Sequence, residues 1–273
     1  MQSTLSMRFL GVGNSHAFEL GCSSCVLEKD HKPLLLIDCG LDTLSRHQQA
    51  YNTLPSAIFI THAHLDHIGG LENLFYKAYF NSQNSDKIKI FVPLKLVEVL
   101  HRRIADYPNI LAEGGINFWD CFQLIPVSES FWLQEFNFTV FPVRHHEFMS
   151  AYGIALNGLF LFTGDTRPIP EIVNKYACHG ELIFHDCGQL PNPSHTGVSE
   201  LEQYYKAEQL KRMVLYHYES QEAGKYIEKL GYKIAQANQL FALRAANLLP
   251  PSNAMNVHEL PSMGAGRNSN TGT

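Results

Sequence analysis

The chain has 273 residues, of which 45% are hydrophobic and 17% are charged, and its formal net charge is -5. This composition is ordinary for a globular protein, and the negative charge argues against a protein that coats nucleic acid nonspecifically. No run of about 18 apolar residues occurs, which argues against a membrane span. The six scattered cysteines, together with an N-terminus that lacks the pattern of a secretory signal, predict a cytoplasmic protein with reduced thiols.

Short apolar runs separated by turn residues fill the first third of the chain and predict strands over residues 7–13, 24–28, 33–40 and 56–64. Further along, apolar residues at helical spacing alternate with more strand-like runs. These patterns predict helices over 71–80, 94–107, 170–177 and 199–212, and strands over 87–93, 116–127, 130–143, 151–165, 181–187 and 212–218. Arg102 and Arg103 are expected on a solvated face of their helix.

Strands followed by helices occur twice along the chain, with Asn157-Gly158 as a hairpin turn in the second half. This order predicts two β-sheets packed together and covered by helices, with the second half arranged like the first. We assign residues 1–248 to this single domain. Residues 249–273 are rich in Pro, Gly, Ser and Asn, which predicts a disordered tail.

The segment THAHLDHIGG, residues 61–70, directly follows the apolar run AIFI. His62 and His64 are two positions apart, so their rings share one face of an extended strand, and Asp66 and His67 follow where the chain turns. Imidazole and carboxylate groups suit Zn, Mn or Fe. Four ligand-type residues in six positions exceed the needs of one open site, which predicts two adjacent ions with further ligands from elsewhere.

Other ligand-type residues also end apolar strands. They are His145, His146, Asp165 and His217. One histidine after a strand is usually an ordinary core or surface residue, but all of them together with the first cluster favour a metal site.

The motif His62-Ala-His64-Leu-Asp66-His67 matches the H-x-H-x-D-H motif of the metallo-β-lactamase superfamily. Asp38 in LLLIDCG matches the aspartate that these proteins carry before the motif, and TGDTRP, residues 163–168, resembles the RNase Z branch. The resemblance spans Met7 to Leu243. It implies an α/β fold, a four-layer αβ/βα sandwich, with the site at one edge of the two sheets.

The resemblance also implies the ligand sets and two divalent ions, most readily zinc, with manganese or iron as alternatives. One ion would be held by His62, His64 and His145, the other by Asp66, His67 and His217, and Asp165 would bridge them. In relatives, the histidine ligand between the motif and the bridging aspartate comes three residues after a proline in a strand. Pro142 therefore selects His145. Strand alternation agrees, although His146 remains an alternative.

Catalytic roles follow from the same resemblance. A hydroxide shared by two ions would attack phosphorus, and Asp66 would orient it as well as bind metal. RNase Z-like enzymes carry a His-Glu pair and a His-Ser-Thr segment near the last ligand; here the matched residues are Asp186, which replaces the glutamate, and His195. A carboxylate-oriented imidazole can act as a general acid, although His195 could instead cap the following helix.

The expected reaction is hydrolysis of a small phosphodiester such as a cyclic nucleotide, as in phage enzymes that destroy pyrimidine cyclic nucleotide signals. One alternative is a tRNA 3′-processing endonuclease that acts on RNA, but the protruding arm and the Pro-x-Lys-x-Arg-Asn loop of RNase Z are absent. Others are a lactone or thioester hydrolase of the same fold and a catalytically silent binding module. Because relatives often form homodimers in which a neighbour's residues close the pocket, we expect a homodimer here.

Overall fold

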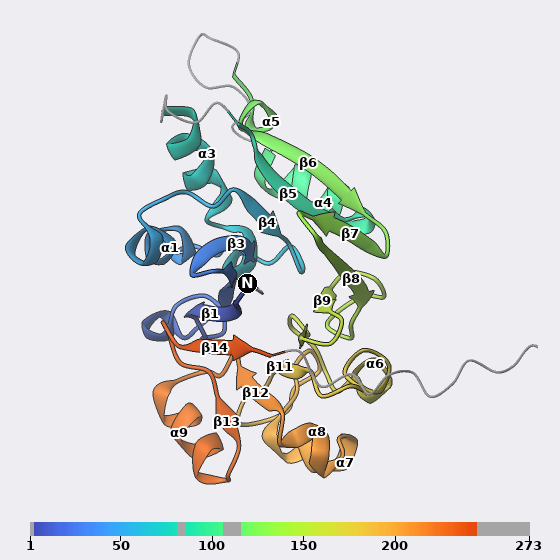
Figure 1. The fold of residues 1–273 in the computed structure, drawn as a ribbon. Coiled ribbons are helices and arrows are strands. Elements are labelled where there is room, and N and C mark those ends of the chain that lie inside the picture. Colours follow the sequence, from blue (N-terminus) through green and yellow to red (C-terminus); the bar gives the residue numbers. More distant parts are fainter. Residues whose placement is uncertain (1–2, 81–85, 106–115, 245–273) are drawn as a thin grey trace, which may run out of the picture.

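The computed structural model describes residues 3–80, 86–105 and 116–244, which form two seven-stranded mixed sheets with helices around them (Figure 1). The predicted sandwich of two helix-covered sheets is therefore confirmed. The tail predicted over 249–273 lies outside the described residues, as do residues 245–248 at the end of the predicted domain. Within the described ranges, no helix combines the length and the hydropathy needed to cross a bilayer.

The first sheet has the strand order β14-β1-β2-β3-β4-β5-β6. The pairs from β14 to β3 are antiparallel and the pairs from β3 to β6 are parallel. Its strands are β1 (Leu5–Gly11), β2 (Ser24–Lys29), β3 (Lys32–Ile37), β4 (Ala57–Phe59), β5 (Ile88–Pro93), β6 (Phe122–Val127) and β14 (Leu240–Leu243).

The second sheet has the order β13-β12-β11-β10-β9-β8-β7, with parallel pairs from β13 to β10 and antiparallel pairs from β10 to β7. Each sheet therefore has an antiparallel half and a parallel half, as expected from a second half that repeats the first. Its strands are β7 (Ser130–Leu133), β8 (Phe136–Pro142), β9 (Tyr152–Leu156), β10 (Phe160–Phe162), β11 (Leu182–Asp186), β12 (Met213–Tyr216) and β13 (Lys233–Ile234).

Helices flank both sheets: α1 and α3 lie beside the first sheet, and α6 to α9 surround the second (Figure 1). The α-helices are α1 (Thr43–Tyr51), α2 (Leu65–Ile68), α3 (Leu71–Phe80), α4 (Val97–Leu100), α5 (Phe118–Cys121), α6 (Pro170–Tyr176), α7 (Leu201–Tyr204), α8 (Ala207–Leu210) and α9 (Gln221–Lys229). The 3₁₀ helices are η1 (Phe18–Leu20), η2 (Leu94–Leu96) and η5 (Val198–Glu200), and η3 (His101–Ala105) is a π-helix.

Aromatic side chains join the two sheets through the middle of the sandwich. Phe9 of β1 packs against Phe184 of β11 and Tyr216 of β12, with ring centroids 5.4 and 5.6 Å apart. A second contact between the sheets joins Phe131 of β7 and Phe91 of β5, whose stacked rings have centroids 4.1 Å apart. Burial of such rings contributes most of the favourable free energy of packing one sheet on the other. It therefore holds the two sheets in fixed relative positions.

One long helix predicted from apolar spacing is continuous in the structure and another is broken. Residues 94–105 pass through η2, α4 and η3, and the rest of the predicted 94–107 helix lies outside the described part of the chain. Residues 198–210 form η5, α7 and α8, with extended backbone at Tyr205 and Lys206. The strand predicted over 116–127 begins instead with the short helix α5.

Candidate metal centre and active-site pocket

Five polar side chains at one edge of the sandwich follow five different strands. Asp38 follows β3, His62 comes after β4, His145 after β8, Asp165 after β10, and His217 directly after β12. All five side chains are buried. Because the sheets pack face to face, these strand ends meet at one edge of the sandwich, where ligands of layered α/β folds bind.

The motif segment is held between the two sheets by its backbone. His62 forms an isolated bridge with Ala151, and the amide of Tyr152 in β9 donates to the Thr61 carbonyl at 2.9 Å. The chain then turns at His64 into the short helix α2, which carries Asp66 and His67. The turn separates the motif into a histidine pair before the helix and an Asp-His pair within it.

The first donor group contains His62, His64, His145 and Asp165, each offering one nitrogen or oxygen within 4.8 Å of the others. His64 Nδ1 lies 3.1 Å from His62 Nε2 and 3.3 Å from His145 Nε2. Asp165 Oδ2 lies 3.5 Å from His62 Nε2. Of the two adjacent histidines, it is His145 that faces this group, from a bend beyond the end of β8.

The second donor group contains Asp66, His67, His217 and again Asp165. Asp165 Oδ2 lies 3.2 Å from His67 Nε2 and 3.1 Å from His217 Nε2, while Asp66 Oδ2 lies 3.5 Å from His67 Nε2. The same oxygen of Asp165 therefore borders both groups. All seven residues predicted as ligands converge in the structure.

Each histidine in these groups directs its remaining ring nitrogen toward a protein atom. His67 Nδ1 lies 2.8 Å from Asp38 Oδ2, and His145 Nδ1 lies 3.0 Å from the Ser194 carbonyl oxygen. His62 Nδ1 lies 3.0 Å from Thr61 Oγ1 and His217 Nδ1 lies 3.5 Å from Asp186 Oδ1. Metal-binding histidines are typically oriented in this way, because the second contact fixes the tautomer and the ring plane.

Several buried polar atoms of the two groups have no hydrogen-bond partner. In the described part of the chain, five buried side-chain atoms are in this condition, and three of them, His67 Nε2, His217 Nε2 and Asp165 Oδ1, belong to the donor groups. Leaving such atoms buried and unsatisfied costs about 1–3 kcal/mol each. A divalent cation would satisfy these donors, so the residues present fit metal ions.

The carboxylates of the site are held in their ionised form. Burial raises the pKa of Asp66, but attraction to the His217 and His67 imidazoles outweighs it and lowers the pKa well below the usual range. Burial likewise opposes ionisation of Asp165, whereas attraction to His217, His67 and His62 lowers its pKa. Ionised oxygens that face imidazole nitrogens are the donor set that zinc and similar cations prefer.

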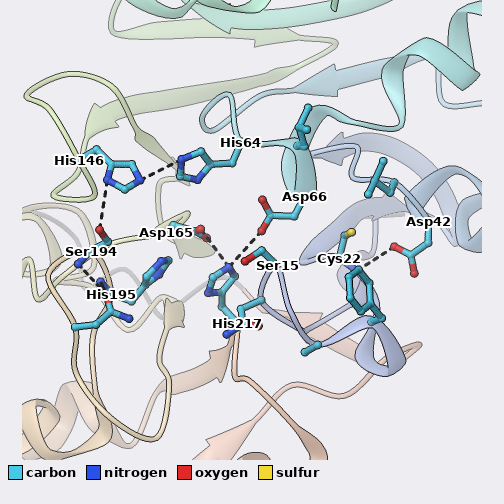
Figure 2. Close-up of a pocket in the computed structure, with 16 residues that line it drawn as sticks. Ser15, Cys22, Asp42, His64, Asp66, His146, Asp165, Ser194, His195 and His217 are labelled. Carbon is cyan, nitrogen blue, oxygen red and sulfur yellow. Dashed lines mark hydrogen bonds and ion pairs between the residues drawn. The ribbon is translucent and has the colours of Figure 1, made fainter. Parts of the chain in front are cut away.

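A cavity of about 830 Å³ opens beside the donor groups and is lined by Asp66, Asp165 and His217 together with His195 (Figure 2). His195 Nδ1 lies 2.8 Å from Asp186 Oδ2, which also accepts from the Thr166 amide at 2.8 Å. Burial lowers the pKa of His195, but the Asp186 carboxylate outweighs it and raises that pKa above its ordinary value. The two residues predicted as a catalytic pair are thus in contact at the cavity wall.

Three further residues support the site. Asp38, which the motif comparison noted without a role, accepts hydrogen bonds from the Thr61 amide and hydroxyl as well as facing His67. His146 Nε2 lies 3.1 Å from His64 Nε2, on the side of that ring away from the donor group. Arg103, expected on a solvated helix face or in a dimer contact, donates from Nη1 to the Ala63 carbonyl at 2.6 Å. No local sequence signal marks this last contact, because it joins residues 40 positions apart.

Residues 5–241 match the family model described as "Anti-Pycsar protein Apyc1". The chain belongs to this family. A relative of that name from Paenibacillus xerothermodurans is 30% identical over 242 residues, covering 84% of this chain and 93% of its own. The metallo-β-lactamase superfamily resemblance is thereby confirmed, and the chain is a metal-dependent hydrolase of the phosphodiesterase type.

Solved structures agree on the fold. A diphosphatase of the PhnP family superposes with a TM-score of 0.68 at 20% identity, covering 90% of this chain and 99% of the other. The short form of human tRNase Z superposes with a TM-score of 0.60, also at 20% identity, covering 88% and 99%. At these identities the similarity shows the αβ/βα sandwich alone.

Proposed function

We propose that this family member hydrolyses cyclic nucleotides with the help of two divalent ions, zinc most readily. The observation that carries the proposal is the position of Asp165 Oδ2, which borders both donor groups. His62, His64 and His145 would hold one ion and Asp66, His67 and His217 the other. Bound ions would supply Lewis acidity, making water easier to deprotonate and offsetting charge on the phosphoryl oxygens.

The chain's own residues would then divide the remaining work. Asp66 lines the cavity with an ionised carboxylate, so its oxygen can accept a hydrogen bond from the attacking water and orient it. His195 uses Nδ1 for Asp186, which leaves Nε2 as the nitrogen that can give a proton to the departing ribose oxygen. Asp186 keeps the imidazole in that tautomer and orientation.

The cavity lining favours a small substrate over RNA. Its volume falls in the range of small-molecule sites, and the described residues that line it include no lysine or arginine. A protein that holds a long phosphate backbone needs several such cations. The family name, which refers to action against Pycsar, also favours cyclic nucleotides over a transfer RNA.

The test is a comparison of substrates on zinc-loaded protein: cyclic mononucleotides, cyclic dinucleotides and a pre-tRNA, with products identified by mass spectrometry. We expect linear nucleotides from cyclic mononucleotides, and a loss of about 10³-fold or more with chelator or in Asp66→Ala, since both remove the activated water. Faster cleavage of the pre-tRNA, or undiminished turnover in Asp66→Ala, would contradict the proposal.

We further propose a cytoplasmic homodimer. Six free cysteines suit a reducing compartment. Phe148 and Leu190 are 88% and 74% exposed, and each is two residues from a cavity-lining residue, His146 or Asn192. Exposed apolar side chains at the rim of a site are common at protein interfaces. Sedimentation equilibrium should give twice the chain mass, and a monomer at micromolar concentration would refute the dimer.

A further inference from the structure

The cavity has two chemically different sides. Figure 2 shows His146, Ser194 and His195 on one side and Ser15, Cys22 and Asp42 on the other, with Asp66, Asp165 and His217 between them. The histidine side has imidazole nitrogens and hydroxyl groups that suit a phosphodiester. The opposite side is built from the loop before β2, the loop after β3 and the start of α2.

Three large apolar side chains from this opposite side line the cavity and remain exposed to solvent. Phe18 is 79% exposed, Leu41 60% and Leu65 54%. One exposed apolar side chain needs no explanation, but three that line the cavity of the donor groups mark a place for an apolar occupant. We call these three residues the apolar wall.

The apolar wall is fixed to the protein by polar contacts behind it. Asp42 Oδ1 accepts from the Cys22 amide at 2.9 Å, and its Oδ2 accepts from Arg46 Nε. The first of these bonds joins the loop that carries Phe18 to the loop that carries Leu41, and the second ties Asp42 to α1. Leu20 of η1 is buried, so the short helix is anchored by one side chain while Phe18 remains exposed.

The wall begins beside the donor groups, because Leu65 lines the same cavity as His64 and Asp66. A phosphodiester held at the donor groups therefore has the wall next to it. The part of a cyclic nucleotide that suits an apolar, aromatic surface is the nucleobase, whose flat face stacks on aromatic rings.

We propose that Phe18, Leu41 and Leu65 form the nucleobase subsite of this enzyme, with Phe18 as the stacking residue. This inference rests on the proposed function, because it takes the substrate to be a cyclic nucleotide. Phe18 contributes to substrate binding and not to bond cleavage, so its removal should weaken binding of the base and leave the reaction at phosphorus unchanged.

The experiment compares a cyclic mononucleotide with the base-free ribose 3′,5′-cyclic phosphate in wild type, Phe18→Ala and Phe18→Tyr. Stacking on an aromatic ring is worth enough that Phe18→Ala should raise KM for the nucleotide about tenfold. The kcat/KM for the base-free compound should stay within about twofold, and Phe18→Tyr should restore the nucleotide KM because it keeps the ring. Phe80→Ala, which removes an exposed phenylalanine of α3 that is not in the cavity lining, is the matched control.

Binding provides a second readout that does not need turnover. Equilibrium dialysis of the cyclic nucleotide against Asp66→Asn, with and without Phe18→Ala, measures the subsite alone. A wild-type enzyme that hydrolyses no cyclic nucleotide would refute the proposed function. The subsite is judged separately, by comparing the nucleotide's dissociation constants for Asp66→Asn with and without Phe18→Ala.

Three results would overturn the subsite. They are equal losses on both substrates, an unchanged nucleotide KM and binding in Phe18→Ala, or a change in oligomeric state alone. The last result would make the apolar wall a contact between two copies of the chain.

Discussion

A hydrogen bond from Arg103, which is not part of the donor groups, fixes the backbone between His62 and His64. Ala63, the residue between His62 and His64, accepts a hydrogen bond from Arg103 of the π-helix η3. A charged donor on a carbonyl oxygen forms a stronger bond than a neutral pair. Arg103 therefore stabilises the backbone direction that lets both imidazoles face one point, although it is not itself a donor to that point.

Removing this contact should weaken metal binding. We expect Arg103→Met, which keeps the apolar stem, to lower zinc affinity about tenfold, the usual scale for losing a contact that orients ligands. Competition with a chromogenic chelator measures this. Arg102→Met is the matched control, because Arg102 forms its ion pair with Glu98 on an exposed helix surface. Equal zinc affinities for the two variants would show that Arg103 has no such role.

At the level of elements, the sequence predicts best where periodicity and local signals decide the structure. The strands around the donor residues are in their expected places because apolar runs ending in polar side chains mark buried strands. The helix predicted over 199–212 fails at Tyr205, whose hydroxyl accepts from the Ile169 amide at 2.8 Å and lies 2.6 Å from His185 Nε2. Tyr205 makes these contacts from an extended backbone position, which ends the helix. No local sequence pattern reveals a contact with residues so far away in the chain.

The short helix α5 could have been predicted. Asn117 accepts from the Trp119 amide, and Asp120 accepts from the Asn117 amide, which is a reciprocal cap at the start of a helix. The apolar alternation of β6 follows directly, so the pattern predicts the whole of residues 116–127 as one strand and the cap is overlooked. For the site, the motif predicted four of the seven residues in the donor groups, and polar residues at the ends of other apolar strands predicted His145, Asp165 and His217. Asp38's three bonds and the Arg103 contact depend on how the elements pack.

A buried polar cluster joins α1 to the first sheet. Glu28 of β2 accepts from Arg8 Nε at 2.6 Å, from the Tyr51 hydroxyl at 2.7 Å and from the Ser6 hydroxyl at 3.0 Å. Burial raises the pKa of Glu28, but these three bonds outweigh it and lower the pKa below its ordinary value. The ionised form of Glu28 therefore stabilises the folded chain.

This cluster gives stability a defined pH dependence. Because the pKa of Glu28 is lower in the folded state, its contribution is fully present above its unfolded pKa of about 4.5 and is lost as the pH falls through the folded value. Glu28→Gln should lower the free energy of unfolding by about 1–3 kcal/mol at pH 7, with a smaller difference below pH ~4. Urea unfolding at both pH values measures this. Glu135→Gln, which breaks an exposed pair with Lys29, should change little; a Glu28→Gln deficit independent of pH would contradict the argument.

Across the whole molecule, the two donor groups join the two halves of the sandwich. His62, His64, Asp66 and His67 come after strands of the first sheet, while His145, Asp165 and His217 come after strands of the second. Neither sheet alone provides a complete donor group, because Asp165 belongs to both. Ions would bind there only when the two sheets are packed together, and would therefore stabilise the folded state.

Metal removal should therefore lower the stability of the whole fold. Binding to the folded state alone adds about 2.7 kcal/mol when free ligand is a hundred times the dissociation constant. We expect chelator-treated protein to melt several degrees lower than zinc-loaded protein, with recovery on adding zinc, as measured by calorimetry. In Asp66→Ala the difference should shrink. Identical melting temperatures with and without chelator would mean that the donor groups do not bind the ion.

The pairing of β1 with β14 joins the two ends of the described chain, with Leu5 opposite Leu243. During translation, the outer backbone groups of β1 have no strand beside them until β14 has left the ribosome. A nascent chain that stalls before Leu240 would expose an open strand edge, which promotes aggregation. Completion of the first sheet is thus tied to the synthesis of β14, so termination before Leu240 yields a chain that chaperones bind or proteases degrade.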